Sequence, residues 1–405
     1  IFDFNNSTQL AEATNRLLGN EKLRSKMRIA GLQKTAATAW ENTAIAYAHL
    51  FNKVLEKEQS LIYSLPPISI AHIKRMSRSF GMIQFSKGNR PDIKTGYTLD
   101  DNVRALMALC HVYVKTKDPS CEKYIKKYLT FIRYCQQPDG SFLNYVDKQL
   151  AFTTQNAEIN LEDSNARAIY ALGYFISLRG KFPDVWTEDA TEIIEQTFDM
   201  IMKMKSPRSI AYIIKGLYHF EQAYPSKEVR EMTMHLADQL VHYYHQNAEN
   251  NWHWFEAYLT YDNSIIPESL LYAYQVIKNE TYKETARESF HFLLHHIFTK
   301  EQIKVVSNQG WFQKEGNRNC YGEQPIEIAG TVMALSTFYS VFGEEQYLIK
   351  QQIAFSWFLG NNHLRQIIYN PATGGCYDGL EEHNINLNQG AESTVCYLLA
   401  RLIIK

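Results

Sequence analysis

Adjacent carboxylates stand at two places where a polar stretch runs into an apolar one. Asp100 and Asp101 form the first pair, and Glu162 and Asp163 form the second. Glycoside hydrolysis needs two carboxylates around the scissile bond, one protonated to assist the leaving group and one ionised to activate water or attack the sugar. Successive helical residues point about 100° apart, so one member of each pair should cap its helix while the other faces a cavity. Either member fits the apolar pattern; we predict Asp101 and Asp163 as the catalytic pair.

Three later polar stretches carry further acids. Glu268 directly follows Pro267, Glu327 lies two residues after Pro325, and Glu392 stands in the string NQGAEST. The small residues beside Glu392 leave space for a ligand, but they equally suit close packing between helices. We predict Glu268 and Glu392 as substitutes for the catalytic acids and Glu327 as a substrate ligand.

Aromatic residues are dense in the loops before these stretches, which is typical of sites where sugar faces stack. The string WHWFEAYLTYDNS alone contains Trp252, Trp254, Glu256 and Asp262. Packing between helices explains many tyrosines in any helical protein, so a structural role stays open. The predicted substrate-binding residues are Asp100, Glu162, Trp252, Trp254, Glu256, Asp262, Trp311, Glu327, Tyr377 and Asp378.

Histidines would indicate a different reaction. A sugar epimerase or isomerase needs bases that remove a proton from carbon, commonly two histidines of near-neutral pKa. Only His253 and His383 fall in loops beside the predicted acids, and carboxylates outnumber them there. No cluster of His, Asp or Glu has metal-ligand spacing, so we predict neither a metal nor a cofactor.

The elements that must position these residues repeat along the chain. Six polar stretches, each followed by an apolar helix with small residues, recur about every 60 residues, which indicates one helical hairpin per repeat. Amphipathic, charged helices lie between them, as expected for helices that face solvent. We therefore predict an all-α fold, an (α/α)6 toroid with inner and outer rings and all six inner-helix starts at one rim. The stretches begin at Thr98, Asn160, Ser206, Ile266, Glu323 and Asn388.

Composition is that of an ordinary globular chain. The 405 residues are 45% hydrophobic with a formal net charge of −1, which gives no bias toward nucleic acid. No run approaches the roughly 18 apolar residues of a membrane span. The six cysteines lack metal or disulfide spacing, and the opening residues show no signal peptide, so we expect a cytoplasmic location. The opening Ile suggests a fragment or a processed chain.

The first 58 residues resemble the C-terminal tail of retaining glycosyltransferases with two Rossmann-like domains. The matching residues are Leu10, Ala11, Ala13, Leu17, Leu18, Arg24, Met27, Gly31, Trp40, Ala44, Tyr47 and Phe51. None of that family's donor-binding residues falls in this segment, so no transferase activity carries over. A generic helical cap on the toroid is the alternative interpretation.

Residues 66–405 resemble six-hairpin toroid domains found alone or fused behind such glycosyltransferases, and more distantly the toroid glycoside hydrolases. The strings that carry the likeness are GYTLDDNVRAL, WFEAYLTYDNSIIPESLLYA, EQPIEIAGTVMAL and NQGAEST. The resemblance implies a carbohydrate substrate, an oligosaccharide or polysaccharide, and a fused or missing transferase domain as partner. We predict a glycoside hydrolase; the alternatives are a glycan-binding or accessory module of a glycosyltransferase, and a sugar epimerase.

Overall fold

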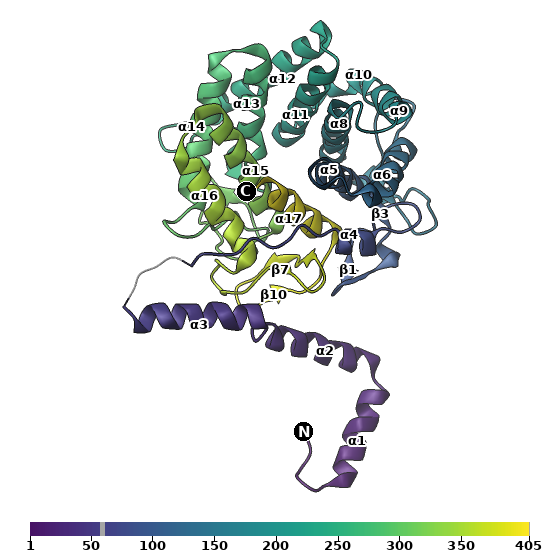
Figure 1. Ribbon diagram of the computed structural model, residues 1–405, viewed down its shortest axis with the longest axis vertical. Coiled ribbons are helices and arrows are strands. Elements are labelled where there is room, and N and C mark those ends of the chain that lie inside the picture. The colour runs from purple at the N-terminus through teal and green to yellow at the C-terminus, as the bar shows by residue number, and fades with distance from the viewer. Residues whose placement is uncertain (57–60, 405) are drawn as a thin grey trace.

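A computed structural model describes residues 1–56 and 61–404, and it shows a ring of helices with a separate helical arm (Figure 1). The predicted end of the arm at residue 58 and the final Lys405 lie outside the described residues. The predicted (α/α)6 toroid is confirmed: six inner helices contact one another in sequence, and the sixth returns to the first. The inner helices are α5 (Leu99–Thr116), α8 (Glu162–Ser177), α11 (Pro207–Ala223), α13 (Ile265–Ile277), α15 (Pro325–Phe342) and α17 (Ala391–Ile403).

Each inner helix packs against an outer helix of its own, and α13 also contacts α12. Five outer helices follow their inner partners along the chain, but the partner of α17 is the short α4, which precedes all the others. The ring is therefore closed by its first and last helices. The outer helices are α4 (Ala71–Met76), α6 (Glu122–Cys135), α9 (Asp184–Glu195), α12 (Lys227–Asn247), α14 (Glu280–Ile297) and α16 (Glu345–Ser356).

The inner helices are buried on almost every side, because their own apolar and small residues let neighbouring helices pack closely around them. The closest approach joins α8 and α11, where a Cβ on Gly173 would meet the carbonyl oxygen of Gly216 at 2.1 Å. Helix α15 is long and apolar enough to cross a membrane by length and composition, yet it packs between α13 and α17 with 61% of its residues buried. A core helix of a globular protein meets the same criteria.

Polar residues fix where the inner helices begin. The Thr98 hydroxyl accepts from the Asp101 N–H at the start of α5, and the Ser206 hydroxyl accepts from the Ser209 N–H at the start of α11. Such caps satisfy backbone donors that the first turn leaves free. Helix α13 begins at Ile265, so Pro267 and Glu268 lie within its first turn.

Short strand pairs, absent from the predicted all-helical pattern, join the loops between helices. The pair β3 (Tyr97–Thr98) and β4 (Tyr145–Val146) is antiparallel, as is the pair β5 (Tyr258–Leu259) and β6 (Phe312–Gln313). The second pair ties together two loops more than fifty residues apart at the rim. The other pairs are β1 (Ser86–Lys87) with β2 (Arg90–Pro91), β7 (Tyr369–Asn370) with β8 (Gly375–Cys376), and β9 (Gly379–Leu380) with β10 (Ile385–Asn386).

The arm consists of α1 (Ser7–Leu18), α2 (Glu21–Ala36) and α3 (Trp40–Val54). Helices α1 and α2 bury no residue, and α3 buries only Asn42 and Ile45. The Asn42 side chain accepts a hydrogen bond from the Ile367 N–H of the toroid at 2.8 Å. Helix α2 adds one long contact, from Gln33 Nε2 to Asn384 Oδ1 at 3.5 Å. The arm is therefore anchored chiefly through α3, and it leaves the ring in Figure 1.

Candidate active site

A cavity of about 500 Å³ opens at the rim where the inner helices begin. Five of the six inner helices line it with residues of their first turns or caps, and the loop before α13 supplies the sixth side. The predicted convergence of the helix starts on one cavity is thus observed. The ionisable residues that line it are Asp100, Tyr145, Glu162, Asp163, Arg167, Tyr261, Glu327 and Glu392.

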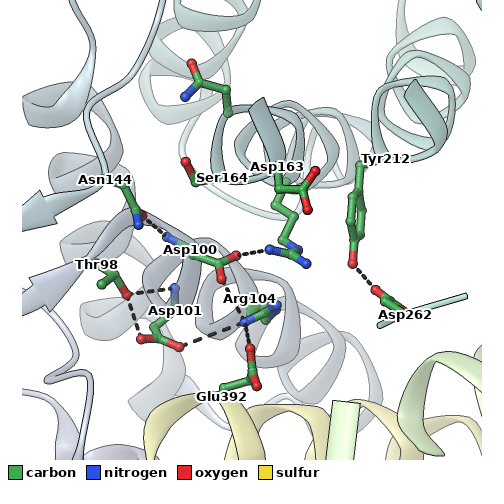
Figure 2. A network of polar contacts seen from close by, with 12 residues as sticks. Thr98, Asp100, Asp101, Arg104, Asn144, Asp163, Ser164, Tyr212, Asp262 and Glu392 are labelled. Atoms are coloured by element: carbon green, nitrogen blue, oxygen red, sulfur yellow. Dashed lines mark hydrogen bonds and ion pairs between the residues drawn. The ribbon is translucent and has the colours of Figure 1, made fainter. Parts of the chain in front are cut away.

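Asp100 is the member of the first pair that faces the cavity. Its Oδ1 accepts from Arg167 Nη1 at 3.0 Å and its Oδ2 pairs with Arg104 Nη1 at 3.1 Å. Arg104 Nη1 also donates to Glu392 Oε2 at 2.8 Å, so one guanidinium links the first and last inner helices. Charge-assisted bonds of this kind hold both carboxylates in fixed orientations (Figure 2).

Asp101 does not line the cavity; it lies between Thr98 and Arg104, 4.0 Å from Arg104 Nη1 (Figure 2). The Thr98 hydroxyl donates to Asp101 Oδ2 at 2.6 Å, and only 5% of Asp101 is exposed. Burial and the charge of Asp100 raise the pKa of Asp101 to about 8. Asp101, predicted as catalytic, therefore lies behind the cavity wall in this structure, and Asp100 has the position predicted for the catalytic member.

Both members of the second pair line the cavity, and both also hold the start of α11. Glu162 Oε2 accepts from the backbone N–H groups of Lys205 and Ser206, at 3.2 and 3.0 Å. Asp163 Oδ1 accepts from the Ser209 hydroxyl at 2.6 Å, and its Oδ2 accepts from the Tyr261 hydroxyl. Burial acts to raise the pKa of Asp163, but the charge of Arg167 and these hydrogen bonds outweigh it and lower the pKa below its usual value.

Glu327 has the opposite electrostatic environment. It lines the cavity from the first turn of α15 and is only 6% exposed. Burial, and then the charge of Asp262, raise the pKa of Glu327 to about 8. The Asp262 N–H donates to Glu327 Oε1, and this bond fixes the carboxyl group. At neutral pH the cavity thus contains a protonated carboxyl, Glu327, and an ionised one, Asp163.

One predicted stacking residue reaches the cavity. Trp311 is 52% exposed, lines the cavity, and stacks on Tyr258 with ring centroids 4.6 Å apart. The pairing of β5 with β6 brings these two loops together. Trp252 and Trp254 are 4% and 0% exposed and pack against Phe292 and Phe255, so their burial argues against the predicted stacking on a sugar.

Five other predicted residues do not line the rim cavity; one of them, Asp262, accepts from the Tyr212 hydroxyl. Glu268 forms a buried ion pair with Lys215 at 2.7 Å, and Glu256 pairs with Arg208 at 2.7 Å. Tyr377 accepts from Asn370 Nδ2 at 2.9 Å. Asp378 accepts from the Gly390 N–H at 2.7 Å, and burial raises its pKa to about 6. Glu268 and Glu256 thus pair with cations, and Asp378 caps a helix. These three acids have structural roles away from the rim cavity.

The two histidines considered for epimerisation also lie elsewhere. His253 pairs with Glu288 at 3.1 Å and His383 lies near Glu382 at 3.7 Å, both outside the rim cavity. Two inner-helix histidines, His111 and His219, lie deep in the ring, where burial lowers their pKa values to about 4 and about 3. Within residues 1–56 and 61–404, no histidine lines the rim cavity.

Three arginines of the inner helices were missed by the sequence reasoning. Arg104, Arg167 and Arg208 are all at least nine-tenths buried, and each pairs with a carboxylate or stacks on a tyrosine ring. A buried charge in an apolar helix requires such a partner. An arginine within the first two turns of each of three apolar helices was the signal that could have identified them.

Comparison with known proteins supports the fold. No family model and no curated protein sequence matches the chain. Among solved structures, the cellobiose 2-epimerase of Bacillus thermoamylovorans is similar, with a TM-score of 0.64 and 10% identity over 89% of this chain and 99% of that one. A D-mannose isomerase has a TM-score of 0.59 and 14% identity, with coverage of 89% and 98%.

A third similar structure is a glycoside hydrolase. The α-1,6-mannanase of Salegentibacter, solved as an inactive variant with α-1,6-mannotriose, has a TM-score of 0.55 and 11% identity over 82% of this chain and 95% of that one. At these identities the likeness establishes the toroid fold, which serves hydrolases and epimerases alike.

Proposed function

We propose that this protein hydrolyses a glycosidic bond of an oligosaccharide bound in the rim cavity. The observation that carries the proposal is the presence of two carboxyl groups with opposite pKa shifts in one cavity. Glu327 is protonated at neutral pH and can give its proton to the glycosidic oxygen. Asp163 is ionised and serves as the second carboxylate, the one that activates water or attacks the sugar.

Other features of the cavity suit a sugar. Trp311 offers an exposed aromatic face, and Asp100, Glu162 and Glu392 offer oriented carboxylate oxygens to hydroxyl groups. Arginines and backbone N–H groups hold these carboxylates in place before a ligand binds. Binding therefore costs little side-chain entropy. A cavity of about 500 Å³ falls in the usual range for sites that bind small molecules.

The adjacent aspartates Asp100 and Asp101 are an alternative pair of catalytic groups. The inactive mannanase variant has asparagine in place of two consecutive aspartates. Here Asp100 faces the cavity and Asp101 has a pKa of about 8, so this pair also combines an ion-paired carboxylate with a protonated one. Burial of Asp101 behind the wall favours Glu327 as the acid.

Sugar epimerisation is a second candidate function, favoured by the similarity to cellobiose 2-epimerase and D-mannose isomerase. That reaction requires a base beside a carbon-bound proton. The groups available in the rim cavity for this task are carboxylates, which are weaker bases than histidine at neutral pH. Hydrolysis uses the same carboxylates in their observed protonation states, so we favour it.

The helical arm provides a proposal about partners. Large apolar side chains on α1 to α3 are exposed, among them Leu18, Trp40 and Phe51. We propose that these faces pack on a glycosyltransferase-type domain, for which the resemblance of residues 1–58 is the support. In that arrangement a toroid without catalysis would act as a glycan-binding module.

The test is product analysis with single substitutions. The wild type and the variants Glu327→Gln, Asp163→Asn and Asp101→Asn are incubated with α- and β-linked gluco- and manno-oligosaccharides, and products are separated by chromatography. We expect shorter sugars from the wild type and a loss of at least about 100-fold in the first two variants. Asp101→Asn should stay within about tenfold of the wild type, because its side chain does not face the cavity.

The other outcomes redirect the assignment. Loss of cleavage in Asp101→Asn with retention in Glu327→Gln would transfer the acid role to the aspartate pair. A changed hexose without cleavage would identify an epimerase. Binding without any product would identify the accessory module.

A further inference from the structure

A second, smaller cavity lies deeper in the ring, directly below the rim cavity. Its volume is about 40 Å³, and Arg167 and Ile326 line both cavities, so the two adjoin. We call it the floor cavity. Its remaining walls come from later turns of the inner helices: Val103, Arg104, Met107, Tyr170, Tyr212, Ala329, Gly330, Met333, Cys396 and Leu399, together with Asp262.

Three polar atoms of the floor cavity have no hydrogen-bond partner among the described residues. They are Nη2 of Arg104, Nε of Arg167 and Oδ1 of Asp262. Their side chains are 7%, 7% and 5% exposed. An unpaired buried polar atom costs about 1–3 kcal/mol, so three around one small cavity call for a polar group that pairs them, either an ordered water or a ligand atom that displaces it.

The other atoms of these side chains are already paired. Arg167 bonds Asp100. Figure 2 shows that Arg104 also bonds Asp100 and that the Tyr212 hydroxyl donates to Asp262 Oδ2. These bonds hold the side chains of Arg104, Arg167 and Asp262 in place, so the orientation of their unpaired atoms is fixed. The atoms left free are therefore one carboxylate oxygen and two nitrogens, Arg104 Nη2 with two N–H bonds and Arg167 Nε with one.

The chemistry of this set matches one hydroxyl group. A hydroxyl has two lone pairs, which can accept one N–H from each arginine, and one O–H for Asp262 Oδ1. A phosphate or carboxylate brings only acceptors and leaves Asp262 unpaired, whereas an ammonium brings only donors and leaves both arginines unpaired. About 10–15 Å³ admits one water-sized group, so the floor cavity of about 40 Å³ has room for a hydroxyl or hydroxymethyl group.

We propose that the floor cavity binds a single free hydroxyl of the sugar in the rim cavity and so selects substrates that are unmodified at that position. The proposal rests on the proposed function only in taking a sugar as the ligand, and it does not depend on which carboxylates act in catalysis. The substrate class is a neutral hexoside with a free hydroxyl, and not a deoxy, amino or acidic group, at the inserted position.

Gly330 of α15 controls access to Asp262. A Cβ at this position would lie 2.3 Å from Asp262 Oδ1, closer than any ordinary contact. Gly330→Ala therefore places a methyl group against the free acceptor. Alanine also favours helix over glycine, so the variant should not weaken the helix itself.

The experiment measures binding rather than turnover, by calorimetry. The probes are the methyl α- and β-glycosides of glucose and mannose, and then the four monodeoxy derivatives, at C2, C3, C4 and C6, of whichever binds best. The variants are Gly330→Ala and, as a matched control, Ser336→Thr. The control also adds one methyl group to α15, at a position outside both cavities.

We expect one deoxy position to weaken binding to the wild type at least 100-fold, because removal of the hydroxyl leaves buried groups unpaired. Gly330→Ala should bind the parent sugar as weakly as the wild type binds that deoxy derivative, and the two changes together should not add. Ser336→Thr should keep the wild-type pattern. A general disturbance of the fold would instead weaken all five sugars equally.

Three results would overturn the inference. They are equal binding of the parent and all four deoxy sugars, undiminished selectivity in Gly330→Ala, and no binding of any probe to the wild type. Cleavage measured in parallel separates the two proposals: hydroxyl selectivity without cleavage keeps the floor cavity and rejects the hydrolase, and cleavage without selectivity does the reverse.

Discussion

At the scale of single residues, the environment of each acid determines what it can do. Asp100 and Asp101 are chemically identical neighbours, yet one lies between two arginines at the cavity and the other is buried against a threonine. Asp163 and Glu327 line the same cavity with pKa values shifted in opposite directions. The assignment of roles therefore depends on partners that lie on other helices.

Trp311 gives a direct prediction about sugar binding. Trp311→Ala should weaken binding of the best oligosaccharide by about tenfold or more, because the exposed ring at the cavity is lost. Trp40→Ala is the matched control, since Trp40 is also exposed but belongs to the arm. Calorimetric titration of both variants provides the measurement; equal effects in the two would exclude a stacking role for Trp311.

Asp101 predicts a dependence of stability on pH. Its pKa is about 8 in the folded protein and near the ordinary 3.8 in the unfolded chain. Between these values the folded state keeps a proton that the unfolded state has released, so the free energy of unfolding falls as pH rises from about 4 to about 8. Glu327 contributes in the same direction.

Asp101→Asn removes the titrating group and should flatten this dependence. We expect the variant to gain on the order of 1 kcal/mol or more over the wild type between pH 5 and pH 8. Urea unfolding at both pH values measures the difference. Parallel pH profiles for the two proteins would show that Asp101 titrates normally.

The sequence predicted which stretches contribute acids to the rim, but not how each acid is oriented. Position along the chain was sufficient for Glu162, Asp163 and Glu392, since helix starts converge in a toroid. Orientation depends on contacts with residues far away in the chain, such as Arg104 with Glu392. Trp252 and Trp254 illustrate the limit, because a dense aromatic loop serves packing as readily as binding.

At the scale of elements, the inner helices were predictable because each has a polar start followed by an apolar run. The strands were not, since each of these strands has only two residues and thus no alternation to detect. The strand pair β5 and β6 nevertheless decides where Trp311 lies. The helical period thus predicts the scaffold, and irregular loop pairings complete the site.

The buried ion pair between α11 and α13 predicts a stability effect. Lys215 and Glu268 are 1% and 2% exposed, and the Thr337 hydroxyl of α15 also donates to Glu268, at 2.8 Å. Lys215→Met leaves Glu268 as an unpaired buried charge and should cost about 3–5 kcal/mol. The double variant Lys215→Met/Glu268→Leu should recover most of that loss.

Thermal unfolding of the three proteins tests this prediction. Lys227→Met is the control, because the ion pair of Lys227 with Glu231 lies on the surface of α12 and its loss should leave the Tm unchanged. A double variant as unstable as Lys215→Met would mean that the pair is needed for packing as well as for charge compensation.

At the scale of the whole molecule, the arm and the toroid are predicted to be separable. Helices α1 and α2 bury nothing, and α3 contacts the ring through few residues, chiefly Asn42 and Ile45. A chain shortened to begin at Leu61 should keep its Tm within a few degrees and bind sugars with unchanged affinity. Calorimetry and titration measure both; an unfolded product would show that α3 is part of the toroid's fold.

The pairing of α4 with α17 places the two ends of the toroid side by side. Arg401 of α17 donates to the carbonyl oxygen of Pro66 at 2.6 Å, across more than three hundred residues of sequence. During synthesis, therefore, the sides of α5 and α15 that contact α17 stay exposed until α17 has left the ribosome. Closing so long a loop costs entropy, and the contacts that offset this cost form last, so we expect the ring to open first at the seam between α4 and α17.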